Sequence, residues 1–270
     1  VYAFWNCSGR VIRLKIFYNS LVYINISDLK IYYQEAGEGK DLILIHGWKQ
    51  DVSSFWGLVD LLKTDFKLYL IDLPGFGRSD APKNPYTISD YSEIVKKFIE
   101  EKKIKKPIVL GHSLGGRVGI KLASTNPNLI DKLILEDAAG IKPKQDPLKP
   151  FIYVIAKIFR HLIPNVFNLK EKLRHLFYKK IESDYLNAGV LTETLTNILD
   201  EDLTPDLKKI ETETLLIWGE KDPNDESSRA SGKKMYRLIK NSRIEIFEGV
   251  GHFPHLEKPI LFASYVKDFS

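Results

Sequence analysis

The sequence predicts an α/β fold with an eight-stranded, mostly parallel sheet, helices on both of its faces, and a helical insertion between the sixth and seventh strands. Three observations lead to this prediction. Short apolar runs alternate with amphipathic segments of helical length along most of the chain. One long segment contains no strand-like run. The chain has 270 residues, 44% of them hydrophobic, which suits one large domain that carries an insertion.

Eight short runs have the composition of strands. The first two, Val22–Ile26 and Lys30–Gln34, flank Ser27-Asp28 and predict a hairpin. The other six are largely apolar, as expected of strands that are covered on both faces. They are Leu42–Ile45, Leu68–Ile71, Ile108–Leu110, Leu133–Leu135, Leu215–Trp218 and Ile244–Phe247.

Amphipathic segments of helical length lie between these runs, which favours a parallel sheet with crossover helices. The predicted helices are Phe55–Leu62, Tyr91–Glu101, Leu114–Ser124, Ser227–Ile239 and Pro259–Phe269. The domain organisation follows from the same pattern. We expect an N-terminal extension over residues 1–20, a core formed by residues 21–141 and 206–270, and a helical cap over residues 142–205.

The predicted cap breaks the alternation of strands and helices. It opens with the linker-like Lys142–Pro147 and continues through Phe151–Ile163 and Val166–Lys180, both rich in apolar residues at helical spacing. It leaves the sheet after the sixth strand and returns before the seventh. We therefore expect it to cover the carboxyl ends of the strands and to supply an apolar substrate pocket.

Composition and charge argue against several classes of function. The net charge is +5, but the lysine-rich runs are interleaved with glutamate, as in Glu100–Lys103, and no nucleic-acid-binding motif accompanies them. The single cysteine, Cys7, allows neither an internal disulfide nor a cysteine metal site. No apolar run reaches the roughly 18 residues of a membrane span, and Val1–Ser20 is broken by charges where a signal peptide would be apolar. We expect a cytoplasmic protein that uses no cofactor, metal or nucleic acid.

The most informative motif is Gly111-His112-Ser113-Leu114-Gly115, which follows a predicted strand and precedes a predicted helix. In that context the sequence G-x-S-x-G predicts a sharp turn that lifts the serine clear of the sheet. The flanking glycines fit a turn that has no room for a Cβ atom. Ser113 is therefore the candidate nucleophile.

A serine hydroxyl needs a base, and His252 is the best candidate. It lies in a glycine-framed loop just after the last predicted strand, where the loops of an open α/β sheet converge. The other five histidines fit the role less well. They are His46 at a strand end, His112 inside the turn, His161 and His175 in the insertion, and His255 at a helix start.

The base needs an orienting acid, and Asp222 follows the seventh predicted strand in Trp218–Pro223. The chain order is then Ser113, Asp222, His252. Asp137, at the end of the sixth strand, is the main rival, and Asp225 and Glu220 are weaker ones. Backbone N–H groups of Leu114 and Trp48 are the predicted oxyanion donors, because one heads the helix after the serine and the other follows the third strand.

These motifs together resemble the α/β-hydrolase fold in its capped, esterase-like members. The resemblance extends from about Leu21 to the C-terminus and implies hydrolysis of carboxylic esters or related acyl compounds without a cofactor. The chain departs from the usual pattern at Lys49, where a second glycine is common, and at residues 224–226, where an apolar-Pro stretch is usual. The matching stretches are His46–Trp48, Asp72–Ser79, Gly111–Gly116, Trp218–Asp222 and Gly251–Glu257.

The prediction is a serine hydrolase that cleaves esters of small hydrophobic molecules through an acyl-enzyme on Ser113. Two alternatives remain open: a C–C bond hydrolase of the ring-cleavage type, and a ligand-binding member of the fold without turnover. Haloalkane dehalogenases and epoxide hydrolases resemble the chain too, but they carry aspartate where this chain has Ser113.

Overall fold

A computed structural model of the chain describes residues 3–5, 11–13, 22–141, 191–222 and 226–270. They form an eight-stranded sheet in the order β10-β9-β8-β7-β5-β6-β4-β3 and a separate two-stranded sheet, β1-β2. The two strands of the small sheet are β1 (Ala3–Trp5) and β2 (Val11–Arg13). The strands of the large sheet are β3 (Val22–Ile26), β4 (Leu29–Ala36), β5 (Lys40–Ile45), β6 (Phe66–Ile71), β7 (Ile108–His112), β8 (Lys132–Glu136), β9 (Glu213–Gly219) and β10 (Ser242–Phe247).

The large sheet is parallel except at one edge, where β3 pairs antiparallel with β4 and β4 pairs antiparallel with β6. All other neighbouring strands run parallel, so their carboxyl ends meet at one edge of the sheet. The register pairs His112 with Glu136 and Glu136 with Ile217. The loops that follow β7, β8 and β9 therefore begin side by side.

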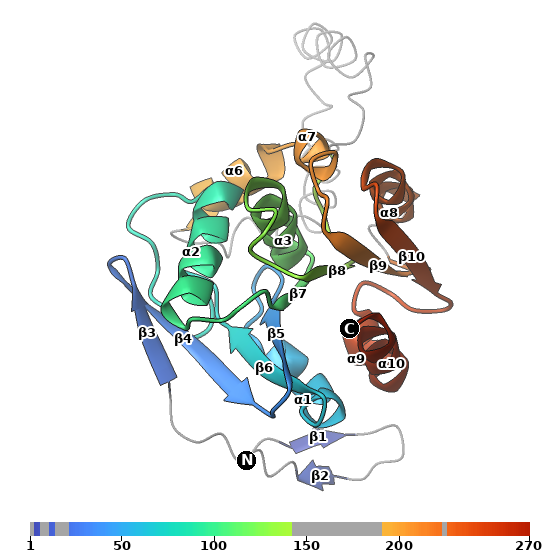
Figure 1. Cartoon of the computed structure of the whole chain (residues 1–270), viewed down its shortest axis with the longest axis horizontal. Coiled ribbons are helices and arrows are strands. Elements are labelled where there is room, and N and C mark those ends of the chain that lie inside the picture. The colour runs from blue at the N-terminus through green and yellow to red at the C-terminus, as the bar shows by residue number, and fades with distance from the viewer. Residues whose placement is uncertain (1–2, 6–10, 14–21, 142–190, 223–225) are drawn as a thin grey trace, which may run out of the picture.

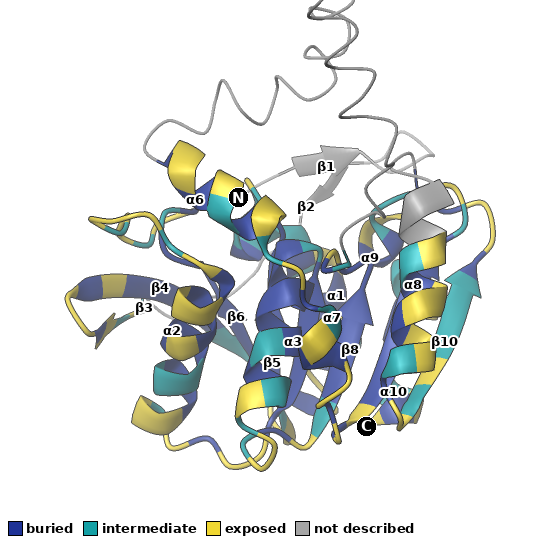
Figure 2. Cartoon of the chain, turned by 90° about the horizontal axis from the view of Figure 1, so that it is seen from above, coloured by how far each residue is buried: buried dark blue, intermediate teal, exposed yellow. Residues whose placement is uncertain are grey.

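Helices cover both faces of the sheet (Figure 1). Apolar side chains of α2 (Ile88–Glu101), α3 (Leu114–Thr125) and α8 (Glu226–Leu238) belong to the core on one face. Those of η1 (Val52–Phe55), α1 (Trp56–Leu62) and α10 (Pro259–Phe269) belong to the core on the other. The central strands are buried from both sides (Figure 2). This burial explains why their sequences are continuous apolar runs.

The helices begin where the sequence provides caps and turns. Helix α2 starts after Thr87, whose hydroxyl accepts a hydrogen bond from the backbone of Asp90, while the Asp90 carboxylate accepts one from the backbone of Thr87. This capping box satisfies N–H groups that the first turn of a helix leaves unpaired. Each predicted strand and each of the five predicted helices overlaps an observed element, and the predicted fold class is confirmed.

The described part of the predicted cap consists of α6 (Thr192–Asp200) and the start of α7 (Thr204–Leu207), which spans the predicted boundary at residue 205. Leu203 and Leu207 are fully buried in the core that α2 and α3 share. Residues 142–190, with both apolar segments predicted as cap helices, lie outside the described residues.

None of the described helices has the length and apolar character that crossing a membrane requires. The last short helix is α9 (Pro254–Glu257).

Candidate active site

Ser113 lies in the turn between β7 and α3, in a backbone conformation that L-residues rarely adopt. Its φ angle is 50° and its ψ angle is −106°. A Cβ atom on Gly111 would collide with the backbone of Gly115, and one on Gly115 would collide with the backbone of Ile45. The strained turn is thus possible only with glycine at both positions. The structure therefore has the sharp turn that G-x-S-x-G predicts.

The turn is fixed from the neighbouring strand. The backbone N–H of Ser113 donates to the carbonyl oxygen of Glu136 over 3.0 Å, one residue beyond the last paired residue of β7. Leu114 is the first residue of α3, so no residue of that helix accepts its N–H. A helix N-terminus also carries a partial positive charge that favours an anion. Both features are those that an oxyanion donor requires.

The loop after β5 contains the second predicted donor, Trp48. The ring of Trp48 packs against that of Phe76 with 4.9 Å between centroids. Lys49 follows with a φ angle of 58°, in the left-handed region that favours glycine. The side-chain oxygen of Gln50 accepts the N–H of Gly47 over 2.7 Å. The loop thus adopts a glycine-like conformation at the position where the sequence has lysine.

His46 is a structural residue that fastens this loop to the end of β6. Its Nδ1 donates to the carbonyl oxygen of Gly47 over 2.7 Å, and its Nε2 accepts the N–H of Leu73 over 3.0 Å. Burial lowers the pKa of His46 to about 4, although the hydrogen bond to Gly47 acts in the opposite direction. A neutral ring with one donor and one acceptor fits these two partners.

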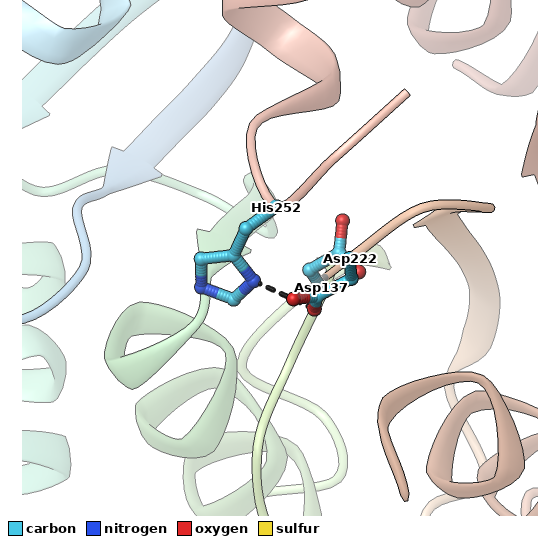
Figure 3. A group of neighbouring side chains, drawn as sticks. All are labelled: Asp137, Asp222 and His252. Carbon is cyan, nitrogen blue, oxygen red and sulfur yellow. Dashed lines mark hydrogen bonds and ion pairs between the residues drawn. The ribbon is translucent and has the colours of Figure 1, made fainter. Parts of the chain in front are cut away.

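His252 and Asp222 form a hydrogen-bonded pair. The Nδ1 atom of His252 lies 2.9 Å from Oδ2 of Asp222 (Figure 3). The Asp222 side chain is 1% exposed, whereas the His252 side chain is 20% exposed. The carboxylate is therefore held out of solvent while part of the imidazole stays accessible. This is the arrangement in which an acid orients a base.

Backbone contacts between the loops after β9 and β10 bring the pair together. The N–H of Lys221 donates to the carbonyl oxygen of Val250 over 2.7 Å. The N–H of Gly251 donates to the carboxylate of Glu257 over 3.0 Å. A Cβ atom on Gly219 would collide with the carbonyl oxygen of Gly251. The glycine that ends β9 thus permits the close approach of these loops.

His112 connects the serine turn to the loop that carries His252. Its Nε2 donates to the carbonyl oxygen of His252 over 2.9 Å, and the two rings lie 4.9 Å apart between centroids. Burial lowers the pKa of His112 to about 3, so the ring stays neutral. Ser113 and His252 are both described residues, and no hydrogen bond joins their side chains. Such contacts often form only when substrate binds.

Asp137 is the third member of the cluster around His252. One ligand atom from each of Asp137, Asp222 and His252 lies within 4.8 Å of the others (Figure 3). Burial raises the pKa of Asp137 to about 9, and the negative charges of Glu136 and Asp222 act in the same direction. These groups could ligate a cation, but the Nδ1 of His252 already bonds Asp222. We therefore interpret the cluster as a hydrogen-bonded one.

The remaining sequence candidates lie elsewhere. Glu220 accepts the N–H of Gly249 over 3.0 Å. His255 bonds Glu136, a pairing that the sequence does not predict. The only signal for it is a charged residue that ends an apolar run. Three further candidates, His161, His175 and Asp225, lie outside the described residues.

Comparison with known proteins adds a family match. Residues 41–178, just over half of the chain, match the model of the alpha/beta hydrolase fold family. The crystal structure of a membrane phospholipase A superposes with a TM-score of 0.72 at 26% identity, over 93% of this chain and 85% of that one.

Two relatives of different chemistry match at the same level of identity. A 2-hydroxy-6-oxononadienedioate/2-hydroxy-6-oxononatrienedioate hydrolase of Pseudomonas putida is 27% identical over 90% of this chain and 92% of its own length. A pimeloyl-acyl-carrier-protein methyl ester esterase of Wigglesworthia glossinidia brevipalpis is 27% identical over 88% of this chain and 96% of its own. The first name describes a C–C bond hydrolase and the second an esterase.

Proposed function

The chain belongs to the α/β hydrolase fold family, and from this premise we propose that it is a serine hydrolase that cleaves carboxylic esters of small hydrophobic molecules. Ser113 is the nucleophile, His252 the general base and Asp222 the acid that orients it. The backbone N–H groups of Leu114 and Trp48 stabilise the oxyanion. The observation that carries the proposal is the hydrogen bond between buried Asp222 and partly exposed His252, beside a strained serine turn.

The proposed reaction runs in two halves. His252 takes the proton of Ser113 as the serine attacks the ester carbonyl, and then gives it to the leaving alcohol. Water repeats the cycle on the acyl-enzyme. Asp222 holds the ring so that its Nε2 faces the serine, because its own bond is to Nδ1. The helix N-terminus at Leu114 favours the negative charge that develops on the carbonyl oxygen.

A C–C bond hydrolase is the second candidate. The relative from Pseudomonas putida supports it, and the esterase relative supports the first candidate at the same 27% identity. We rank the esterase first because the loop after β5 lacks the glycine-rich, asparagine-bearing pattern associated with ring-cleavage hydrolases. A ligand-binding protein without turnover is the third reading, and it predicts no hydrolysis of any substrate.

One experiment separates these readings. Hydrolysis of nitrophenyl butyrate and of a vinylogous 1,5-diketone is compared in the wild type, in Ser113→Ala and in Ser264→Ala, which changes an exposed serine on α10. We expect ester turnover in the wild type and in the α10 control, and a loss of about 10⁴-fold in Ser113→Ala. A fluorophosphonate should label all but Ser113→Ala. Faster turnover of the diketone would favour the C–C hydrolase, and unlabelled, inactive wild type would favour a binding protein.

We further propose that residues 142–205 act as a cap that sets the preference for the acyl chain. The described end of this segment is fastened to the core, since the hydroxyl of Thr194 accepts the N–H of Tyr86 and the carboxylate of Glu201 accepts that of Ile88. Replacing residues 142–190 alone with a Gly/Ser linker keeps these anchors. A chain-length series of nitrophenyl esters then tests the proposal: an unchanged preference in the folded variant would exclude it.

A further inference from the structure

Asp137 occupies an unusual position for a carboxylate. It follows β8 with a φ angle of 39° and is 2% exposed. Its backbone N–H donates to the carbonyl oxygen of Ile217 over 3.0 Å, and its Oδ2 accepts the N–H of Gly219 over 3.2 Å. Strand β9 thus holds both its backbone and its side chain. A strained, buried acid that is held in this way calls for a functional explanation.

The groups that face Asp137 are mostly acidic. Within the described part of the chain, the titratable groups around it are Glu136, Asp222 and His252. His252 already bonds Asp222 through Nδ1, so this ring nitrogen is not available to Asp137. Two buried carboxylates that share one site cannot both ionise. One of the pair therefore keeps its proton, and Asp137 is the one that does not bond the His252 ring.

The hydrogen-bond geometry agrees with a protonated Asp137. Its Oδ1 atom is buried, and no group among the described residues donates a hydrogen bond to it. The neighbour of its side chain is the carboxylate of Asp222, a group that can only accept. A proton on Asp137 turns this contact between two acceptors into a donated hydrogen bond. Burial also raises the pKa of Asp137 to about 9, so the proton is retained at neutral pH.

We propose that Asp137 is a neutral positioning residue, which donates a hydrogen bond to the carboxylate of Asp222 and so holds it in place against His252. The proposal rests on the assignment of Asp222 and His252 to catalysis. Asp137 does not touch the reacting atoms. It fixes the orientation of Asp222, which in turn fixes the imidazole.

Asparagine is the discriminating substitution, because its amide can donate to Asp222 and accept from Gly219 as a protonated aspartic acid does. Alanine can do neither. If Asp137 were ionised, asparagine would instead remove a negative charge close to His252, and the acid limb of the pH–rate profile would move to lower pH. The matched control is Asp131→Asn, which removes an exposed carboxylate from the opposite end of β8.

The experiment measures kcat and KM for nitrophenyl butyrate from acidic to mildly alkaline pH. We expect Asp137→Asn and the Asp131 control to keep kcat within about threefold, with an unmoved acid limb. Asp137→Ala should lower kcat by about tenfold or more at nearly constant KM. A shift of the acid limb to lower pH in Asp137→Asn, or wild-type kinetics in Asp137→Ala, would overturn the proposal. If the alanine variant does not fold, the acid limb of Asp137→Asn still decides whether Asp137 is neutral.

Infrared difference spectroscopy provides a readout that does not depend on turnover. The wild type at neutral pH should show the carbonyl band of a protonated carboxyl group, and Asp137→Asn should lack it. If the wild type showed the band while Ser113→Ala kept full activity, the proton on Asp137 would stand and the proposed catalytic role would fall. A wild type without the band would overturn the neutral state of Asp137 directly.

Discussion

Two histidine–carboxylate pairs lie close to His112, and they differ in their exposure to solvent. His252 bonds Asp222 over 2.9 Å, and His255 bonds Glu136 over 2.7 Å. The side chains of the first pair are 20% and 1% exposed, whereas both side chains of the second are completely buried. The centroid of the His112 ring lies 4.9 Å from that of His252 and 5.2 Å from that of His255.

Residue chemistry and distance alone therefore do not identify a catalytic pair. A general base must exchange a proton with substrate, and only a ring with an accessible edge can do this. His255 has none, because its Nε2 is buried without a partner among the described residues. The Glu136 carboxylate therefore holds the His255 ring in the protein interior. The same type of pairing that prepares His252 for proton transfer gives His255 a structural role.

Glu136 shows what the buried pair does for the exposed one. Its Oε1 accepts both the backbone N–H of His255 and the ring Nδ1, and its backbone carbonyl accepts the N–H of Ser113. Burial alone would raise the pKa of Glu136, but electrostatic attraction to His255 and the hydrogen bonds that His255 donates outweigh it, and the pKa is lowered. One residue thus joins the serine turn to the loop that carries His252.

Replacing His252 should have the largest effect on activity. We expect His252→Ala to lower kcat by about 10⁴-fold with little change in the free energy of unfolding, since a partly exposed ring contributes less packing than a buried one. In the wild type, activity should rise with pH along one acid limb, because the base must be neutral. Turnover assays and urea unfolding measure the two effects. Substantial activity in His252→Ala, or a flat pH profile with chemistry rate-limiting, would contradict the assignment.

The next largest effect is expected in the kcat values of variants of the two acids beside His252. Asp222→Asn places an amide against Nδ1 and disfavours the productive tautomer, so we expect kcat to fall by about 10³-fold. Asp137→Asn should cost far less, because it conserves the donor that faces Asp222. The ratio of the two kcat values at one pH is the measurement. The reverse ranking would assign the orienting role to Asp137.

The sequence predicts the exposed pair better than the buried one, for a physical reason. The serine turn is a local feature: Gly111 and Gly115 are needed by a backbone that bends within five residues. The positions of Asp222 and His252 after neighbouring strands follow from the parallel sheet, whose carboxyl ends gather at one edge. Hydrophobic periodicity and turn residues in the sequence are therefore enough to predict both the serine turn and the positions of Asp222 and His252.

Long-range side-chain contacts leave no such local pattern. His255 and Glu136 are 119 positions apart, and nothing near either residue indicates the other. The sequence predicts both Asp137 and Asp222 at the ends of strands, but which of the two acids faces Nδ1 of His252 depends on side-chain direction. Residues 142–190, predicted as cap, lie outside the described residues, so the sequence remains the basis for that prediction.

Loss of the buried pair of His255 and Glu136 should lower the stability of the protein. Glu136→Ala leaves the His255 ring buried without its partner, and we expect the free energy of unfolding to fall by about 3 kcal/mol. Because the pKa of Glu136 is lowered in the folded state, its contribution is present above the pKa of the unfolded chain and is lost as pH falls. Urea unfolding of wild type and variant should therefore converge at acidic pH. A constant gap down to the acid limit would show that the ion pair is not its source.

The smallest effect concerns Glu136 and Asp137, neighbours in sequence whose pKa values shift in opposite directions. Asp137, with no histidine of its own, has its pKa raised by burial to about 9. A raised folded-state value means that the folded protein holds a proton that the unfolded chain releases, so stability falls as pH rises between the two values. Asparagine carries no such proton. Between about pH 6 and about pH 7, the advantage of Asp137→Asn over the wild type in unfolding free energy should therefore grow by about 1 kcal/mol. Parallel urea titrations at the two pH values measure this change, with Asp131→Asn as the control whose gap to the wild type stays constant. An advantage of Asp137→Asn that does not change with pH would mean that Asp137 is already ionised, and the contrast with Glu136 would then rest on geometry alone.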